Sequence, residues 1–527
     1  MSALFATGIL TGATVVPAEA QRLASHWKME GSAGTGHSVA QVGDVNGDGY
    51  HDIAVGNPFF VNGNVQKGKV SVFYGSSTGF ALSESWAAEG SSANEHFGWS
   101  IAGMADINND GYHDVVTGAP GTSTVQGKVY VYYGSASGLS LTPSVTINGH
   151  QTGERFGFAI AAADINNDGR SDLIIGAPYN QGSASSGKVY TYKATSTGLT
   201  SSPVWSLSGS SSLFGFGWSL AIGSVTATSG QFNLVIGAPG INSSDASAVV
   251  LTDLLDDVTP PSTKQVIDGV AGSRFGHSVA IAGKINQDGY EDIIIGAPHF
   301  SNGHDLEGQA LLYLGSSGTC SLAWEIEGNE TSAKFGTSVA GKGRINSDSN
   351  DDVAITAPGS AYSLCVYTGN SASLATTRYT TTDLSESFST ATFFRENSMA
   401  KGGLIIGSPT VSATNGSGSK YIKEFDDWIK REGAAHYDPT NDLSLSTYPN
   451  PAQHQVNFSI VAGNVSGSAN IDIINTLGTI VHSAGNIPVQ QVTQSFALNL
   501  PSLPAGIYYA SVRVAEQTIM QPIHIIQ

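Results

Sequence analysis

Three short loops combine carboxylate and amide side chains with glycine at a fixed spacing. They read DVNGDGYHD from Asp44, DINNDGYHD from Asp106 and DINNDGRSD from Asp164. Oxygen donors at positions one, three and five can converge because the glycine at position six permits the positive φ of a sharp turn. The carbonyl at position seven and the aspartate at position nine can then complete the shell. Hard oxygen donors suit Ca²⁺ better than Mg²⁺, which usually keeps several waters, so the loops predict three calcium sites.

The predicted ligands occupy equivalent positions in each loop. They are Asp44, Asn46, Asp48, Tyr50 and Asp52; Asp106, Asn108, Asp110, Tyr112 and Asp114; and Asp164, Asn166, Asp168, Arg170 and Asp172. The start of the pattern matches an EF-hand loop, but no glutamate follows at position twelve, and an apolar strand replaces the second helix. A calcium loop within a β-hairpin fits better. The alternative is an Asx-rich turn that caps itself without an ion. Stacked carboxylates repel each other without a cation, which favours the metal.

Two later loops keep part of the pattern. They read KINQDGYED and RINSDSNDD, so Lys284 and Arg344 stand at position one. Either a metal binds there or the cationic head fills the site in its place. The weaker candidate ligands are Asn286, Asp288, Tyr290, Asp292, Asn346, Asp348 and Asp352. Two further stretches, 224–233 and 390–402, have lost the pattern.

The loops belong to a repeat of roughly 60 residues, somewhat longer than an ordinary propeller blade. Each unit pairs Phe-Gly, as at Phe97-Gly98, with a later Gly-Ala-Pro, as at Gly118-Ala119-Pro120. Alternation and turn residues predict four strands per unit, which in the second unit cover 98–103, 114–118, 127–133 and 145–149. An extra outer strand at 27–31 is expected to complete the last unit and close the ring.

The Phe-Gly dipeptide, the acidic loop and the Gly-Ala-Pro run follow one another in this order along the chain. Together they resemble the FG-GAP repeats of the integrin α-subunit propeller, over residues 22–430. The resemblance implies an all-β fold, a seven-bladed β-propeller with Ca²⁺ loops on one face and ligand recognition on the other. Successive strands reverse, so the predicted strands independently place the loops between strands one and two on a single face. Integrin α-subunits also carry leg domains and a membrane helix, which are absent here, so integrin-type signalling is not expected.

Ligand candidates therefore lie on the face away from the predicted metals. They are Phe59, Phe60, Asn62, Asn94, Glu95, His96, Tyr179, Asn180, His299, Phe300 and His304. The alternative is that these are variable, solvated loop residues.

A separate small β-domain is predicted for residues 447–527, after a polar linker at 431–446. Its marks are Tyr448-Pro449-Asn450-Pro451, the turn 475–478 and the run 503–508. They resemble the type IX secretion C-terminal sorting domain of Bacteroidetes, which implies export across an outer membrane, followed by release or surface attachment. An adhesive β-sandwich is the alternative. Residues 1–20 end like a secretory signal but lack its basic start, so they are either a truncated signal or an apolar leader.

Composition narrows the functional classes. A net charge of −19 argues against nucleic acid, and no apolar run reaches the length of a membrane-spanning helix. Two cysteines, Cys320 and Cys365, form either one bridge or two buried thiols.

Two classes of function remain. Ser38 and Ser278 lie in hydrolase-like Gly-His-Ser contexts, but the repeat explains both as strand residues. A secreted binding or adhesion propeller for a glycan or protein is therefore expected. The alternative is a polysaccharide-degrading enzyme built on blade loops, with His51 and His113 as first candidates for acid–base work unless they face solvent.

Overall fold

The computed structural model consists of strands and loops, and no helix occurs among the residues it describes. These are residues 21–22, 27–380 apart from short gaps, 390–395, 402–407, 421–426 and the strands between 443 and 525. The gaps are 31, 33, 77–78, 82, 180–185, 211–212, 227–230, 241–247, 255–258, 346–347 and 361–362. The possible leader 1–20, Asn180 and Asn346 therefore lie outside the described residues. The chain divides into two compact units, 1–430 and 431–527.

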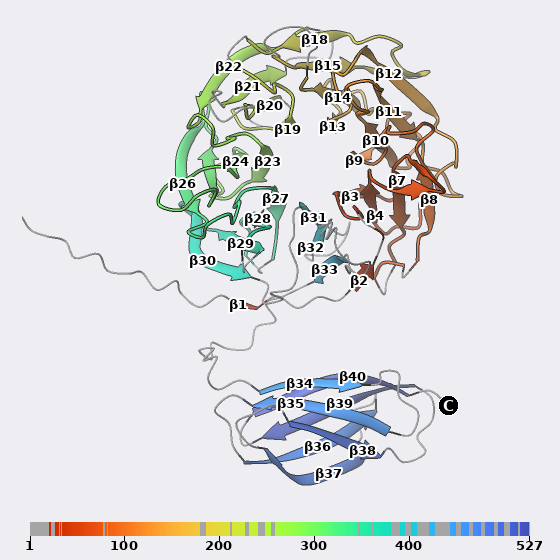
Figure 1. Cartoon of the computed structure of the whole chain (residues 1–527), viewed down its shortest axis with the longest axis vertical. Helices are drawn as coiled ribbons and strands as arrows, with labels where there is room; N and C mark the ends of the chain where they lie inside the picture. Colours follow the sequence, from red (N-terminus) through yellow and green to blue (C-terminus); the bar gives the residue numbers. More distant parts are fainter. Residues whose placement is uncertain are drawn as a thin grey trace, which may run out of the picture. The chain divides into compact units, whose positions relative to one another are not determined.

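The first unit is a β-propeller, as predicted, and six of its sheets are blades made from consecutive strands (Figure 1). Blades 1 to 3 contain β3 (Ser38–Gly43), β4 (Asp52–Asn57), β7 (Lys69–Phe73) and β8 (Trp86–Glu89); β9 (Ser100–Ala105), β10 (Asp114–Ala119), β11 (Gln126–Tyr132) and β12 (Val145–Thr152); and β13 (Ala159–Ala163), β14 (Asp172–Ala177), β15 (Lys188–Tyr192) and β18 (Trp205–Ser208). Each blade is an antiparallel meander. The strands of blade 2 begin within two residues of their predicted positions.

Blades 4 to 6 repeat the meander. They contain β19 (Ser219–Gly223), β20 (Phe232–Ala238), β21 (Ala248–Leu254) and β22 (Ser262–Asp268); β23 (Ser278–Gly283), β24 (Asp292–Ala297), β25 (Gln309–Leu314) and β26 (Ser321–Glu327); and β27 (Val339–Gly343), β28 (Asp352–Thr356), β29 (Leu364–Gly369) and β30 (Leu374–Thr380). Strand β1 (Gln21–Arg22) adds to the outer edge of blade 6, parallel to β30. Two small hairpins, β5 (Val61–Asn62) with β6 (Val65–Gln66) and β16 (Ala194–Thr195) with β17 (Gly198–Leu199), extend from blades 1 and 3.

A further sheet joins both ends of the propeller sequence. Strand β2 (Trp27–Glu30) pairs with β33 (Tyr421–Asp426), followed in the sheet by β32 (Gly402–Gly407) and β31 (Thr390–Arg395). Strand β31 packs beside β27 of blade 6 and β3 of blade 1. The innermost strands of the sheets face the propeller axis (Figure 1).

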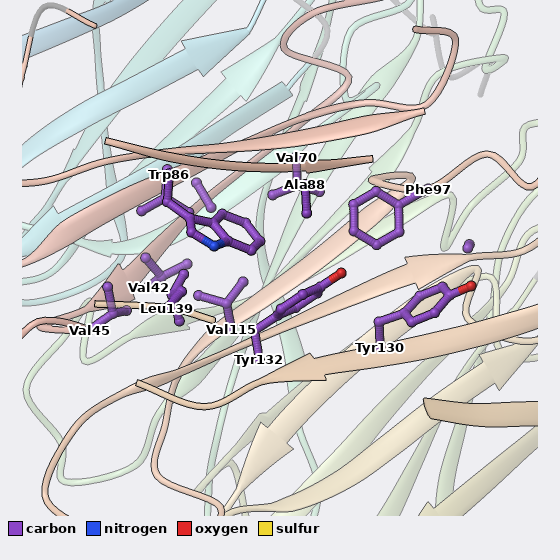
Figure 2. Close-up of a cluster of buried hydrophobic side chains, with 13 residues drawn as sticks. Val42, Val45, Val70, Trp86, Ala88, Phe97, Val115, Tyr130, Tyr132 and Leu139 are labelled. Atoms are coloured by element: carbon purple, nitrogen blue, oxygen red, sulfur yellow. The ribbon is translucent and has the colours of Figure 1, made fainter. Parts of the chain in front are cut away.

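The hydrophobic core lies between neighbouring blades. Between blades 1 and 2, the Trp86 ring meets the edge of Tyr132 with centroids 4.9 Å apart, and Phe97 is completely buried beside them (Figure 2). The Trp86 indole N–H also donates to Ser140 O at 3.0 Å. The repeated Phe and the outer-strand Trp therefore pack between one blade and the next.

The glycines of the repeat allow backbone-to-backbone contact between blades. A Cβ on Gly118 would lie 2.0 Å from Gly157 O of the next blade. Ser100 Oγ donates to the same carbonyl at 2.8 Å. Ser38 and Ser278 make the equivalent bonds to Gly98 O and Gly336 O. The Phe-Gly and Gly-Ala-Pro marks thus form one inter-blade latch, and these serine hydroxyls belong to it.

The cysteines do not form a bridge. Cys320 and Cys365 are both buried thiols, so the disulfide alternative is wrong. Burial raises the pKa of the Cys320 thiol to about 11, and its Sγ donates to Gln265 Oε1 at 3.3 Å.

The second unit contains two antiparallel sheets. One orders β34 (Leu443–Tyr448), β35 (Gln455–Ala462) and β38 (Gln494–Asn499); the other orders β37 (Ile480–Val489), β36 (Gly467–Asn475), β39 (Gly506–Val514) and β40 (Gln517–Ile525). Ile471 and Ile473 of β36 are fully buried, so this unit has apolar packing of its own.

Candidate functional site

The predicted calcium loops lie between the first and second strands of blades 1, 2 and 3. In the first loop, Asp44 Oδ1 accepts Gly47 N–H at 2.7 Å, and its Oδ2 accepts Gly49 N–H at 2.8 Å. Asp48 Oδ1 accepts Tyr50 N–H at 2.9 Å. Gly49 has a φ of 92°, as a sharp turn at position six requires. The backbone thus holds the carboxylates of positions one and five on the same small turn.

Position two anchors each loop in the core, as expected. Val45, Ile107 and Ile165 are at most 4% exposed. Each loop is therefore held in place before a metal binds. This reduces the loss of conformational entropy that metal binding would otherwise cause.

Position nine has a role that the sequence analysis did not recognise. Asp114 is fully buried; its Oδ2 accepts Ile107 N–H at 2.7 Å and its Oδ1 accepts Gly134 N–H at 2.9 Å. Burial raises the pKa of Asp114 to about 7, against the opposing effect of these two bonds. The aspartate thereby joins its own loop to the turn after the third strand. Asp52, Asp292 and Asp352 make the same pair of bonds.

The remaining donor set fits Ca²⁺. Positions one, three and five supply two carboxylates and one amide on an accessible turn, and Asp48, Asp110 and Asp168 are exposed. Asn108 Oδ1 is buried and has no hydrogen-bond donor among the described residues. A cation would satisfy this oxygen. Within the described residues no cluster of three or more His, Cys, Asp or Glu side chains has metal-binding geometry, so these loops would need amide and carbonyl donors to complete a shell.

The third loop differs in one respect. The Arg170 guanidinium lies 4.0 Å from Asp168 Oδ1. This cation shares the carboxylate that a metal would bind, so the third loop is expected to be the weakest of the three.

In the last of the two later loops the cationic residue binds within its own loop. Arg344 Nε binds Asp351 Oδ1 at 3.2 Å, at position eight of its own loop, rather than filling the metal position. Asp351 Oδ2 also accepts Lys284 N–H at 2.8 Å. Asn286 and Asp288 nevertheless keep the same amide-to-carboxylate bond as the first three loops, at 2.9 Å. Position nine is retained here because its role does not need a metal.

Position eight connects the loops of blades 2, 3, 5 and 6 to the loop of the previous blade. His113 N–H donates to Asp44 O at 3.0 Å, and Asp44 N–H donates to His113 Nδ1 at 3.2 Å. Glu291 binds both backbone groups of Ser224 in the same way. His51 is buried, and its Nδ1 contacts Gln41 Nε2. Neither histidine is simply solvent-facing, and the contacts of His113 tie neighbouring loops together.

Residues at the opposite ends of the innermost strands form a continuous surface of rings. In blades 1 to 5 the residue after the glycine of Phe-Gly, or of Thr35-Gly36 in blade 1, contributes one ring. We call these five residues the aromatic belt: His37, Trp99, Phe158, Trp218 and His277. Blade 6 has Thr337 at this position. Consecutive ring centroids are 4.4, 5.2, 4.6 and 5.6 Å apart. All five side chains are half-buried. Burial lowers the pKa of His37 and of His277 to about 4, so both rings are neutral at pH 7.

Several predicted ligand-face residues border this belt. Phe59 and His96 contact each other and Trp99, and Tyr179 contacts both Phe158 and Trp218. The loops before and after a blade therefore do meet on one face. The belt was not predicted from the sequence, although four of its residues directly follow a Phe-Gly dipeptide.

Other ligand-face candidates have structural contacts. Glu95 is fully buried, accepts Ser92 N–H at 2.7 Å and binds the Tyr130 hydroxyl, so it is not a surface group. Asn62 donates to Glu89 Oε2 at 2.8 Å. Lys69 Nζ lies 5.3 Å from the centre of the Phe60 ring, and Phe300 packs on the core between blades 4 and 5. His299 is half-buried, and His304 lies 3.4 Å from Glu307.

The repeats and the C-terminal unit both match known families. The FG-GAP repeat model matches residues 35–73, 97–132 and 156–192, which contain the three predicted calcium loops. The model of the secretion system C-terminal sorting domain matches residues 446–526. The chain therefore carries an FG-GAP β-propeller of the integrin α type and a type IX sorting domain. That domain marks it for secretion to the cell surface or the extracellular space. Among the described residues, no helix is long and apolar enough to cross a membrane.

Similar proteins match about a quarter of this chain. Integrin alpha-IIb of Mus musculus is 40% identical over 151 residues, 27% of this chain and 14% of its own length. Phosphatidylinositol-glycan-specific phospholipase D of Mus musculus is 39% identical over 150 residues, 26% of this chain and 18% of its own length. Integrin alpha-V of Gallus gallus is 35% identical over 154 residues. The chain spans less than a fifth of the length of these relatives.

Proposed function

We propose that this chain is an exported binding propeller that recognises an extracellular glycan or protein through the aromatic belt and its bordering loops. The observation that carries the proposal is the belt itself, because contiguous half-buried rings form a surface that no internal contact covers fully. Protein surfaces used for binding are enriched in such aromatic side chains. The resemblance to integrin α supports an adhesion-like role.

Calcium in the loops of blades 1 to 3 is proposed to stabilise the propeller. Each of these loops is bound to a neighbouring loop through position eight, as with His113 and Asp44. An ion bound in one loop would therefore also restrain the next. The ligand face lies at the other end of the innermost strands, so the metals act as supports rather than as ligand contacts.

The ring is proposed to have seven blades, with β31, β32, β33 and β2 forming the last. Thr390 Oγ1 donates to Gly36 O at 2.7 Å, which repeats the latch between other blades. A Cβ on Gly407 would lie 2.1 Å from the same carbonyl. Closure of this kind leaves no open sheet edge between the first and last blades. The two C-terminal sheets are likewise proposed to pack as a sandwich, and the predicted linker 431–446 is proposed to end where β34 begins at Leu443.

An array of glycans and extracellular matrix proteins tests the binding role. The full chain should retain one class of intact ligand in Ca²⁺ buffer and lose most of that signal in EDTA, because the metal-free propeller is less stable. Release of shortened products from a retained polysaccharide would instead establish the enzymatic alternative. A chain that retains neither glycans nor proteins would contradict the proposal.

A further inference from the structure

Basic residues occupy one repeated position beside the aromatic belt. The residue just before the Phe of Phe-Gly is His96, Arg155, Arg274 and Lys334 in blades 2, 3, 5 and 6. We call these four residues the basic rim. In blades 1 and 4 the same position holds Gly34 and Gly215.

The backbone at this position is left-handed in all six blades. The φ angles of Arg155, Arg274 and Lys334 are 63°, 57° and 54°, and those of Gly34 and Gly215 are 88° and 76°. A side chain at such a φ costs about 1 kcal/mol relative to glycine. Glycine is therefore the residue that local stability favours, and blades 1 and 4 have it. His96 and Arg155 both contact Gly121 O, whereas among the described residues no such contact accounts for the conformational cost at Arg274 and Lys334.

The rim is not neutralised by acidic neighbours. None of the ion pairs among the described residues involves Arg155, Arg274 or Lys334. The nearby Glu154 is buried and binds the Tyr190 hydroxyl at 3.1 Å. Arg155 lies 5.7 Å from the centre of the Tyr179 ring, which itself contacts belt residues. After burial, the charges of Arg274 and Lys334 are the factors that lower the pKa of His299. A chain of net charge −19 thus keeps Arg155, Arg274 and Lys334 beside its belt without an ion pair among the described residues, although Arg155 also donates to Gly121 O.

The belt offers rings rather than an open backbone edge. Trp99 N–H donates to Gly118 O and Trp218 N–H donates to Gly237 O, both at 3.2 Å. His277 N–H is bound by Arg274 O. An extended peptide would add to a sheet through free backbone groups, which are lacking here. Flat apolar faces such as those of sugar rings can instead stack on these aromatic side chains.

We propose that the aromatic belt and the basic rim together bind an acidic polysaccharide. Sugar rings stack on Trp99, Phe158 and Trp218, and carboxylate or sulfate groups bind Arg155, Arg274 and Lys334. The positive rim disfavours a cationic ligand and selects an anionic one. This inference rests on the proposed binding function and names its ligand class.

Calorimetric titration of the full chain with oligogalacturonate tests the inference. The carboxyl-reduced, neutral form of the same oligosaccharide is the matched ligand. The acidic form should bind about tenfold more tightly or better, and added salt should weaken it, because charge-assisted bonds supply the difference. The variant Arg155→Gly/Arg274→Gly should lose about tenfold in affinity for the acidic form only. This variant introduces the residue that Gly34 and Gly215 provide at the same position, and its melting curve measures what the loss of the Arg155 bond to Gly121 O costs.

Two further variants separate the rings from the charges. Trp218→Ala, checked by its melting curve, should weaken both forms of the oligosaccharide. Lys264→Gln removes one positive charge from the outer strand of blade 4 and should leave binding unchanged. Equal affinity for the acidic and neutral forms, or for polyglutamate and oligogalacturonate, would overturn the inference. Retention of another glycan or of a protein on the array, without effect of the rim variant, would overturn it while leaving the binding function intact.

Discussion

Replacing Asp114 with alanine should lower the free energy of unfolding by about 2–5 kcal/mol, because it leaves two buried N–H groups without acceptors. These are the amides of Ile107 and Gly134, which the carboxylate joins at 2.7 and 2.9 Å. The loss should appear in buffer that contains EDTA, since the bonds do not depend on a metal. Urea denaturation of the full chain, followed by tryptophan fluorescence, measures it.

Two variants show whether this loss of stability comes from the two hydrogen bonds of Asp114 or from the calcium site. Asp110→Ala removes an exposed carboxylate from the same loop and should cost less than about 1 kcal/mol in EDTA. Asp114→Asn should be intermediate, because the amide oxygen still accepts one N–H. Asn233 in blade 4 already uses its Oδ1 to accept Val225 and Thr226 N–H. Equal losses for Asp114→Ala and Asp110→Ala would contradict the assigned role of position nine.

Gly118→Ala should be destabilising by about 3 kcal/mol or more, since overpacking against rigid backbone cannot relax locally. The new methyl group would lie 2.0 Å from Gly157 O and 2.3 Å from Ser100 Oγ. The blade must then separate from its neighbour, which also weakens the hydrogen bond of the latch. Thermal melting of the purified chain checks the prediction.

Gly318→Ala is the matched control for this substitution. A Cβ on Gly318 would have no atom within 4 Å, and its φ is not in the left-handed region. The same chemical change should therefore leave the melting temperature nearly constant. If Gly118→Ala and Gly318→Ala have the same melting temperature, the latch does not hold the blades together.

The sequence predicted those parts of the fold that repeat locally. Strand alternation and the Phe-Gly and Gly-Ala-Pro marks are visible within one unit, so the meander and the propeller followed from them. The partners of the latch are not local: Ser100 and Gly157 are 57 residues apart. The pattern therefore showed that these residues recur but not that they meet.

The loops were predicted in part for the same reason. Asp44 and Asp48 act within one turn, and their spacing is sufficient to identify them. Asp52 was assigned to the metal, whereas its carboxylate accepts Gly75 N–H, 23 residues away. The contact of His113 with Asp44 crosses between blades and spans 69 residues. Arg344 binds Asp351 at position eight of its own loop, a contact that the loop pattern did not predict.

Some predicted ligand-face residues, such as Phe59 and Tyr179, border the aromatic belt, but the belt itself was not predicted. Asn62 and Glu95 were predicted as ligand-face residues because they lie in loops, but both bind other residues of the propeller. The belt residues follow a constant Phe-Gly and looked like strand starts. Comparing the residues on both sides of that dipeptide across the units would have found both the belt and the rim.

Calcium binding by the loops is tested most directly by titrating Ca²⁺ into the metal-free full chain in a calorimeter. Three sites should be filled, with the third loop weakest because Arg170 lies beside Asp168. Asp48→Ala and Asp110→Ala should each remove one site and the matching part of the thermal stabilisation. Ca²⁺ uptake and melting that are unchanged in both variants would contradict the account and make these loops turns that cap themselves.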